Sequence, residues 1–150
     1  MKRAAASIFM LMLCVALLAG CASAAREAAF RREEAALFEA RQRAAVRCDP
    51  RVDCDMAWTR TRAFIAAHSF SRIVRVDDTS IETAWPHAFG FVYLAALKEP
   101  TDDGHMLIQL KAMCRGMYDT DGNASVMYST CANSIVAIEA GYRTWMHAAP

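Results

Sequence analysis

Cysteine and histidine are the residues of this sequence with the most versatile chemistry. The chain contains six cysteines and four histidines. The histidines share no spacing, such as His-x-x-x-His, that would make them metal ligands; they are His68, His87, His105 and His147. No Gly-x-Ser-x-Gly elbow, phosphate-binding loop or dinucleotide fingerprint occurs. We therefore predict no catalytic residue, no metal site and no cofactor.

The first 21 residues have the form of a secretory signal. Lys2 and Arg3 are basic, and residues 4–19 form an apolar stretch that ends in small residues. The last four residues of the segment, Leu18-Ala19-Gly20-Cys21, resemble the lipobox of bacterial lipoproteins. In that family the signal is cleaved before the cysteine, whose thiol and new amino group are acylated. The resemblance implies that Cys21 is the lipidation site and that acyl chains anchor the mature protein in a membrane.

Two other fates of this segment stay open. The small-x-small pattern Ala22-Ser23-Ala24 fits ordinary signal cleavage, which would release a soluble periplasmic product beginning at Ala25. The uncharged residues 4–20 fall short of the ~20 residues that a permanent membrane-spanning helix needs. In Gram-negative lipoproteins an Asp after the lipidated cysteine signals retention in the inner membrane, and Ala22 stands there instead. The resemblance thus implies the periplasmic face of the outer membrane, with the inner membrane as the alternative.

Exported proteins meet an oxidising environment, so the other cysteines predict disulfides. Apart from Cys14 in the signal and Cys21, an even number remains: Cys48, Cys54, Cys114 and Cys131. Three pairings are open, and the local pairs Cys48–Cys54 and Cys114–Cys131 need the least rearrangement of the chain. Zinc binding is the alternative, but the cysteine spacings do not match the short separations usual in zinc sites.

Charge argues against one class of partner. The chain has 17 Lys+Arg and 16 Asp+Glu, and its formal net charge is +1. Nucleic-acid binding requires clustered positive charge that displaces counterions from phosphates. We therefore predict no nucleic-acid partner.

Composition divides the chain into a signal at 1–20, the lipidated Cys21 with a stalk at 21–47, and a compact domain at 48–147. The stalk is rich in Ala, Arg and Glu, lacks Gly and Pro, and places Glu27 before Arg31 and Glu39 before Arg43 at helical spacing. It is predicted to be a helix that ends before Pro50. A solvated spacer and a homodimeric coiled coil are both open for it.

Periodicity in the compact domain predicts α+β structure. Helices are expected at 55–68 and 129–147, and strands at 71–76, 79–85, 88–97 and 105–114. Short loops between successive strands predict a four-stranded antiparallel meander, which the two flanking helices cover to form a two-layer sandwich.

The predicted strand at 88–97 is apolar on both faces. One face carries Phe89, Phe91 and Tyr93, and the other carries Val92 and Leu94. Because the helices should cover one face alone, we predict that Val92 and Leu94 form a docking surface. The alternative is that helices cover both faces, or that the stalk folds back over the strand.

These features predict a non-enzymatic, membrane-anchored periplasmic lipoprotein whose compact domain binds an envelope protein or assists envelope assembly. A carrier of small apolar ligands is the alternative, and a hydrolase with an unrecognised site is a distant third. A protein-binding domain predicts a flat apolar patch, whereas a carrier predicts an enclosed pocket. The sequence leaves the oligomeric state open.

Overall fold

The computed structural model describes residues 24–148, and the chain divides into two units after Ala35. In the first unit the described residues, 24–35, are helical. The same helix continues into the second unit as far as Arg43. Ion pairs join Glu27 to Arg31 at 3.7 Å and Glu39 to Arg43 at 3.6 Å, one helical turn apart. The predicted helix is thus confirmed for these residues, although it ends four residues before residue 47.

The second unit is an α+β domain with an antiparallel sheet, which confirms the predicted fold class. We call its described residues, 36–148, the head. The sheet has five strands rather than the predicted four, in the spatial order β1-β5-β4-β3-β2. The strands are β1 (Ala45–Cys48), β2 (Ile73–Val76), β3 (Ser80–Thr83), β4 (Val92–Pro100) and β5 (Met106–Cys114). Strands β2 to β5 form the predicted meander.

The additional strand β1 comes from residues assigned above to the stalk. It pairs antiparallel with β5 from Ala45 opposite Gln109 to Cys48 opposite Met106. Just before β1, the side chains of Leu37, Ala40 and Ala44 are buried. The head therefore begins near residue 36 and not at Cys48. Pairing with β5 satisfies the backbone of β1, and this tertiary contact overrides the helical propensity of its neighbours.

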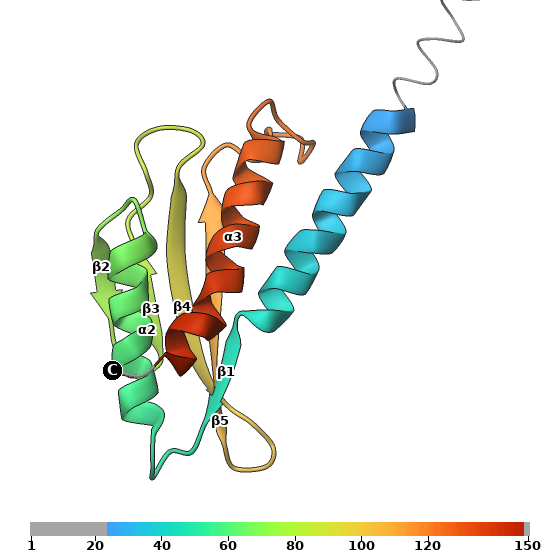
Figure 1. The fold of residues 1–150 in the computed structure, drawn as a ribbon. Coiled ribbons are helices and arrows are strands. Elements are labelled where there is room, and N and C mark those ends of the chain that lie inside the picture. The colour runs from blue at the N-terminus through green and yellow to red at the C-terminus, as the bar shows by residue number, and fades with distance from the viewer. Residues whose placement is uncertain (1–23, 149–150) are drawn as a thin grey trace, which may run out of the picture. The chain divides into compact units, whose positions relative to one another are not determined.

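Helices α2 (Cys54–His68) and α3 (Tyr128–His147) lie on the same face of the sheet (Figure 1). Phe64 and Ile65 of α2 and Ile135 and Tyr142 of α3 are buried there. The hydroxyl groups of Thr61 and Tyr142 are hydrogen-bonded at 2.7 Å between the two helices. Burial raises the pKa of Tyr142 to about 12, so its phenol stays neutral.

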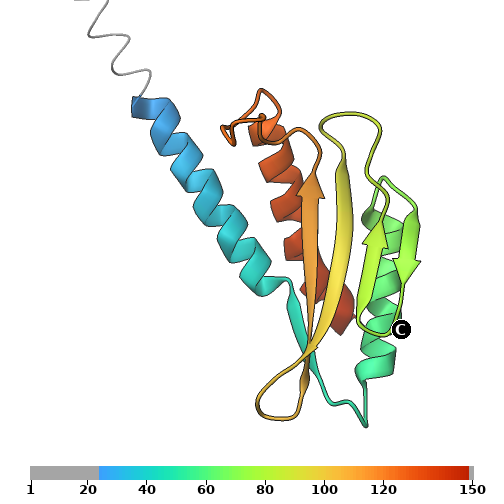
Figure 2. The same ribbon diagram turned by 180° about the vertical axis from the view of Figure 1, so that it is seen from behind.

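Seen from behind, the strands lie in front of both helices (Figure 2). Within the head, neither α2 nor α3 packs on this second face of the sheet. The head is a two-layer structure with one uncovered sheet face.

The uncovered face is the opposite of the one predicted. Val92, Leu94 and Ala96 point towards the helices, and Leu94 is 0% exposed. The prediction that Val92 and Leu94 form a docking surface is wrong. It counted residues 88–91 as strand, whereas β4 begins at Val92, and Phe89 and Phe91 belong to the preceding loop. The helices cover the face with the more compact aliphatic side chains, and Tyr93 lies on the other face.

Both predicted disulfides are confirmed: Cys48 is bonded to Cys54, and Cys114 to Cys131. The first links the end of β1 to the start of α2, and the second links the end of β5 to the first turn of α3. Each bond therefore joins a strand to the helix that follows it in the chain.

The two disulfides should differ in their contribution to stability. In the chain-entropy model the Cys114–Cys131 bond, with a sequence separation of 17, contributes ~3 kcal/mol to the free energy of unfolding. The Cys48–Cys54 bond, with a separation of 6, should contribute less. Denaturant titration of the two double Cys→Ser variants measures both contributions. A larger loss for the Cys48/Cys54 variant would contradict this ranking.

Candidate functional site

The uncovered side of the sheet carries a hollow. We define the open face as the side chains on this surface: Glu82, Trp85, Tyr93, Ala95, Leu97, Gln109, Lys111 and Met113. The hollow has a volume of about 680 Å³, and Arg41 lies at its edge. Trp85 is 68% exposed and Leu97 is 49% exposed, so the hollow is open to solvent.

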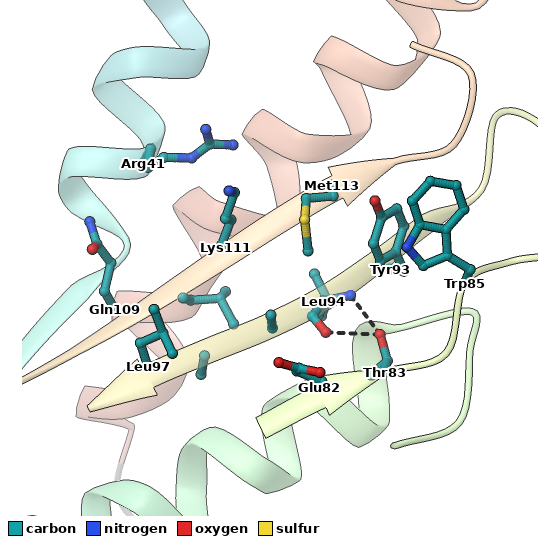
Figure 3. Close-up of a pocket in the computed structure, with 13 residues that line it drawn as sticks. Arg41, Glu82, Thr83, Trp85, Tyr93, Leu94, Leu97, Gln109, Lys111 and Met113 are labelled. Atoms are coloured by element: carbon teal, nitrogen blue, oxygen red, sulfur yellow. Dashed lines mark hydrogen bonds between the residues drawn. The ribbon is translucent and has the colours of Figure 1, made fainter. Parts of the chain in front are cut away.

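The small side chain of Ala95 accounts for the hollow. Ala95 lies on the central strand β4, between the larger Tyr93 and Leu97 on the same face. Its cross-strand partners are Glu82 on β3 and Lys111 on β5. These three residues form one row across the sheet, in which Ala95 lies between an acid and an amine. Figure 3 shows Glu82 and Lys111 on either side of β4.

Trp85 reaches the open face because β3 separates from β4 after Glu82. Regular pairing ends at Glu82 opposite Ala95. The hydroxyl of Thr83 then takes over, accepting the Leu94 N–H at 2.9 Å and donating to the Leu94 carbonyl at 2.8 Å (Figure 3). The chain can then leave the strand without losing these two hydrogen bonds. Trp85 follows, and its ring centroid lies 5.7 Å from that of Tyr93.

The loop at residues 84–91 adds more exposed aromatic surface beside Trp85. The rings of Phe70 and Phe91 meet edge to face at 5.0 Å. The Arg115 guanidinium lies 5.1 Å from the centroid of the Phe89 ring. Arg115 also donates to the Pro86 carbonyl at 2.5 Å and holds the loop against the end of β5. The aromatic surface is thus positioned by the sheet.

The two sides of the open face carry opposite charge. On the β3 side the Arg75 guanidinium lies 3.0 Å from Glu82 and 3.5 Å from Asp77. Backbone N–H groups, foremost that of Thr79, hold the pKa of Asp77 well below its usual range, so Asp77 is ionised. One guanidinium against two carboxylates leaves one net negative charge. On the β5 side Lys111 contributes a positive charge.

Glu139 is a buried carboxylate that sequence reasoning missed. Its side chain is 0% exposed, and its Oε1 accepts the Ala112 N–H at 2.9 Å. Arg41 lies 3.5 Å from the same oxygen and donates to the Ala112 carbonyl at 3.2 Å. Together these two side chains form hydrogen bonds with the N–H and carbonyl groups of Ala112, where β5 extends beyond its pairing with β1. An acid on the buried stripe of α3, four residues after Ile135, was the signal in the sequence.

Glu139 should make stability depend on pH. Burial raises the pKa of Glu139, and this effect exceeds the opposing effects of the Ala112 N–H and Arg41. The folded state therefore holds the proton to higher pH than the unfolded state does. The resulting stabilisation is fully present below the ordinary pKa of glutamate and is lost as pH rises through the raised pKa.

The matched variant is Glu139→Gln, whose amide oxygen can still accept the hydrogen bond from the Ala112 N–H but which cannot ionise. The free energy of unfolding of the wild type, relative to this variant, should decrease as the pH is raised above the ordinary pKa of glutamate. Denaturant titrations at several pH values measure it. A difference that stays constant across these pH values would contradict the assignment.

The structure does not bring the residues predicted from sequence together into one site. Within residues 24–148, one group of three side chains has metal-ligand geometry: Cys48, Asp53 and Cys54. The two sulfur atoms of this group are bonded to each other, so neither is a thiolate that could bind a metal. Cys21 lies outside the described residues. Among the histidines, His68 stacks on Phe64 at 4.0 Å and belongs to the packing between helices.

The open face offers apolar surface and two opposite charges for non-covalent contact. It combines exposed aromatic and aliphatic side chains with one acid and one amine, all on a rigid sheet. Over residues 24–148, no helix is both long and apolar enough to cross a membrane. No family model, curated protein or solved structure matches this chain.

Proposed function

We propose that this protein is a lipid-anchored lipoprotein on the periplasmic face of the outer membrane and that its head binds an envelope protein. The lipobox resemblance at Leu18-Ala19-Gly20-Cys21 supports the anchor. The single observation that carries the binding role is the open face, where Trp85 and Leu97 are exposed on a sheet that α2 and α3 cover from behind.

A protein partner suits this surface better than a small apolar ligand. A carrier needs an enclosed pocket that buries most of its ligand. The hollow above Ala95 is instead open, and charged groups flank it on both sides. An exposed Trp beside a half-buried Tyr is typical of protein interfaces, in which both residue types are enriched.

Binding also suits the open face better than catalysis does. Glu82 and Lys111 lie two strands apart, roughly 9–10 Å between backbones. Acid–base or nucleophile–base pairs need hydrogen-bond contact between their side chains. The two groups are placed to contact different parts of one partner.

Substitution of Leu97 tests this role. Leu97→Lys places a charge on the open face, whereas Val126→Lys makes the same change at a 99% exposed valine in the loop before α3. Full-length proteins are solubilised from their own membranes in mild detergent and their complexes sized on native gels. We expect a complex larger than the single chain for the wild type and Val126→Lys, and its loss for Leu97→Lys. An unchanged complex in Leu97→Lys would contradict the proposal.

A further inference from the structure

We infer that the partner bound by the open face is a second copy of this chain, with the two heads packed sheet to sheet. This inference rests on the proposed function, because it takes the open face as the interaction surface. It is carried by the arrangement of charge in the row Glu82, Ala95 and Lys111.

The open face is complementary to itself under one particular symmetry. Two copies that share the same surface are related by a two-fold axis, which for stacked sheets lies in the plane between them. When this axis runs parallel to β4 above Ala95, the β3 side of one copy lies over the β5 side of the other. Glu82 of each copy then faces Lys111 of the other. One symmetry operation forms two opposite-charge pairs.

The alternative axis, perpendicular to the strands, does not have this property. It places Glu82 over Glu82 and Lys111 over Lys111, so both contacts repel. The net charges agree with the first arrangement, because the β3 side carries one negative charge and Lys111 one positive charge. Arg41, next to Lys111, lies 3.5 Å from Glu139. When Glu139 is ionised it neutralises Arg41, and when it is protonated Arg41 adds a second positive charge to the β5 side, so the two sides keep opposite signs.

Shape and apolar surface also fit two stacked sheets. Packed sheets lie about 10 Å apart with their strands nearly aligned, which leaves room for one layer of side chains from each copy. The hollow above Ala95 provides space for the stems of Glu82 and Lys111 to lean across the row (Figure 3). Tyr93, Leu97 and Trp85 surround this centre and supply apolar contact. The charge pairs therefore set the orientation, and the apolar side chains supply most of the affinity.

Anchoring strengthens such a contact. Two copies held in one membrane by their acyl chains are confined to a thin layer, which raises their effective concentration. A modest interface between the heads is then enough to populate the dimer.

Charge reversal tests the inference. Full-length chains with two different C-terminal tags are produced together, solubilised in mild detergent and captured by one tag, and the amount of the other tag is measured. The pairs are wild type with itself, Glu82→Lys with itself, Lys111→Glu with itself, and Glu82→Lys with Lys111→Glu. Thermal unfolding of each variant shows whether its head is folded.

The geometry predicts a distinctive pattern. For each single variant paired with itself, the amount of the second tag that is captured should fall at least about tenfold, because both charge contacts become repulsive. The mixed pair should recover capture, because the lysine introduced in one chain meets the glutamate introduced in the other, and the unchanged Lys111 and Glu82 meet as before. If a single variant is unfolded, the double variant E82K/K111E with itself replaces it and should also recover capture.

Failure of the mixed pair, with both variants folded, would overturn the inference. So would absence of self-capture in the wild type. If the larger complex of the wild type still forms and is lost in Leu97→Lys, the proposed function stands and the partner is a different protein. If no complex forms at all, both fail.

Discussion

Replacing Leu94 with lysine is expected to unfold the head. Leu94 is 0% exposed, on the face of β4 that α2 and α3 cover. The substitution removes a buried aliphatic side chain and places an ammonium group in the core between the sheet and the helices. Such changes belong to the small class that destabilises by more than about 4 kcal/mol, a large share of the roughly 5–15 kcal/mol typical of a domain.

Leu97→Lys is the matched control, three residues further along the same strand. Leu97 is on the open face and 49% exposed, so its lysine remains in water and should change the free energy of unfolding by less than about 1 kcal/mol. Circular dichroism during thermal unfolding compares the two variants. Equal stability of Leu94→Lys and Leu97→Lys would contradict the assignment of the two faces.

Replacing Cys21 with serine is expected to abolish membrane retention. The proposed anchor consists of acyl chains on Cys21, and each buried methylene contributes ~0.8 kcal/mol to membrane binding. Serine has no thiol to form the thioether. Detergent partitioning and intact-mass analysis should show a triacylated N-terminus in the wild type and none in Cys21→Ser.

Cys14→Ser is the control for this change, since Cys14 lies within the segment that the proposed cleavage before Cys21 would remove. It should leave the mature protein and its membrane retention unaltered. A wild-type mature chain that begins at Ala25 and stays in the aqueous phase would contradict lipid anchoring.

Residue periodicity within single segments predicted most helices and strands of the head, because these elements form largely from their own sequence. Helix α3, expected at 129–147, is found at Tyr128–His147, and β5, expected at 105–114, is found at Met106–Cys114. The disulfides were predictable because each joins cysteines close in sequence. Periodicity and spacing are properties of single segments, and these features depend on little else.

The features that sequence reasoning missed depend on contacts between distant segments. Strand β1 is extended because β5 offers it a partner, and the four residues Ala45–Cys48 are too few to show a strand pattern by themselves. Which face of β4 is covered depends on where the loop at 84–91 ends and on how closely two helices approach. Thr83 and Glu139 replace backbone partners at the ends of β-pairing, at positions that no local pattern marks.

The most direct test of the central claim, that the open face binds a protein, is site-specific photocrosslinking from position 93 in the protein's own membranes. A photoreactive phenylalanine analogue replaces Tyr93, which lies beside the hollow, and in a control chain it replaces the exposed Val126. We expect an adduct from position 93 and none from position 126, and an adduct of two identical chains if the partner is a second copy. Irradiation that leaves the position 93 protein as a single chain, or that crosslinks both positions equally, would contradict the claim.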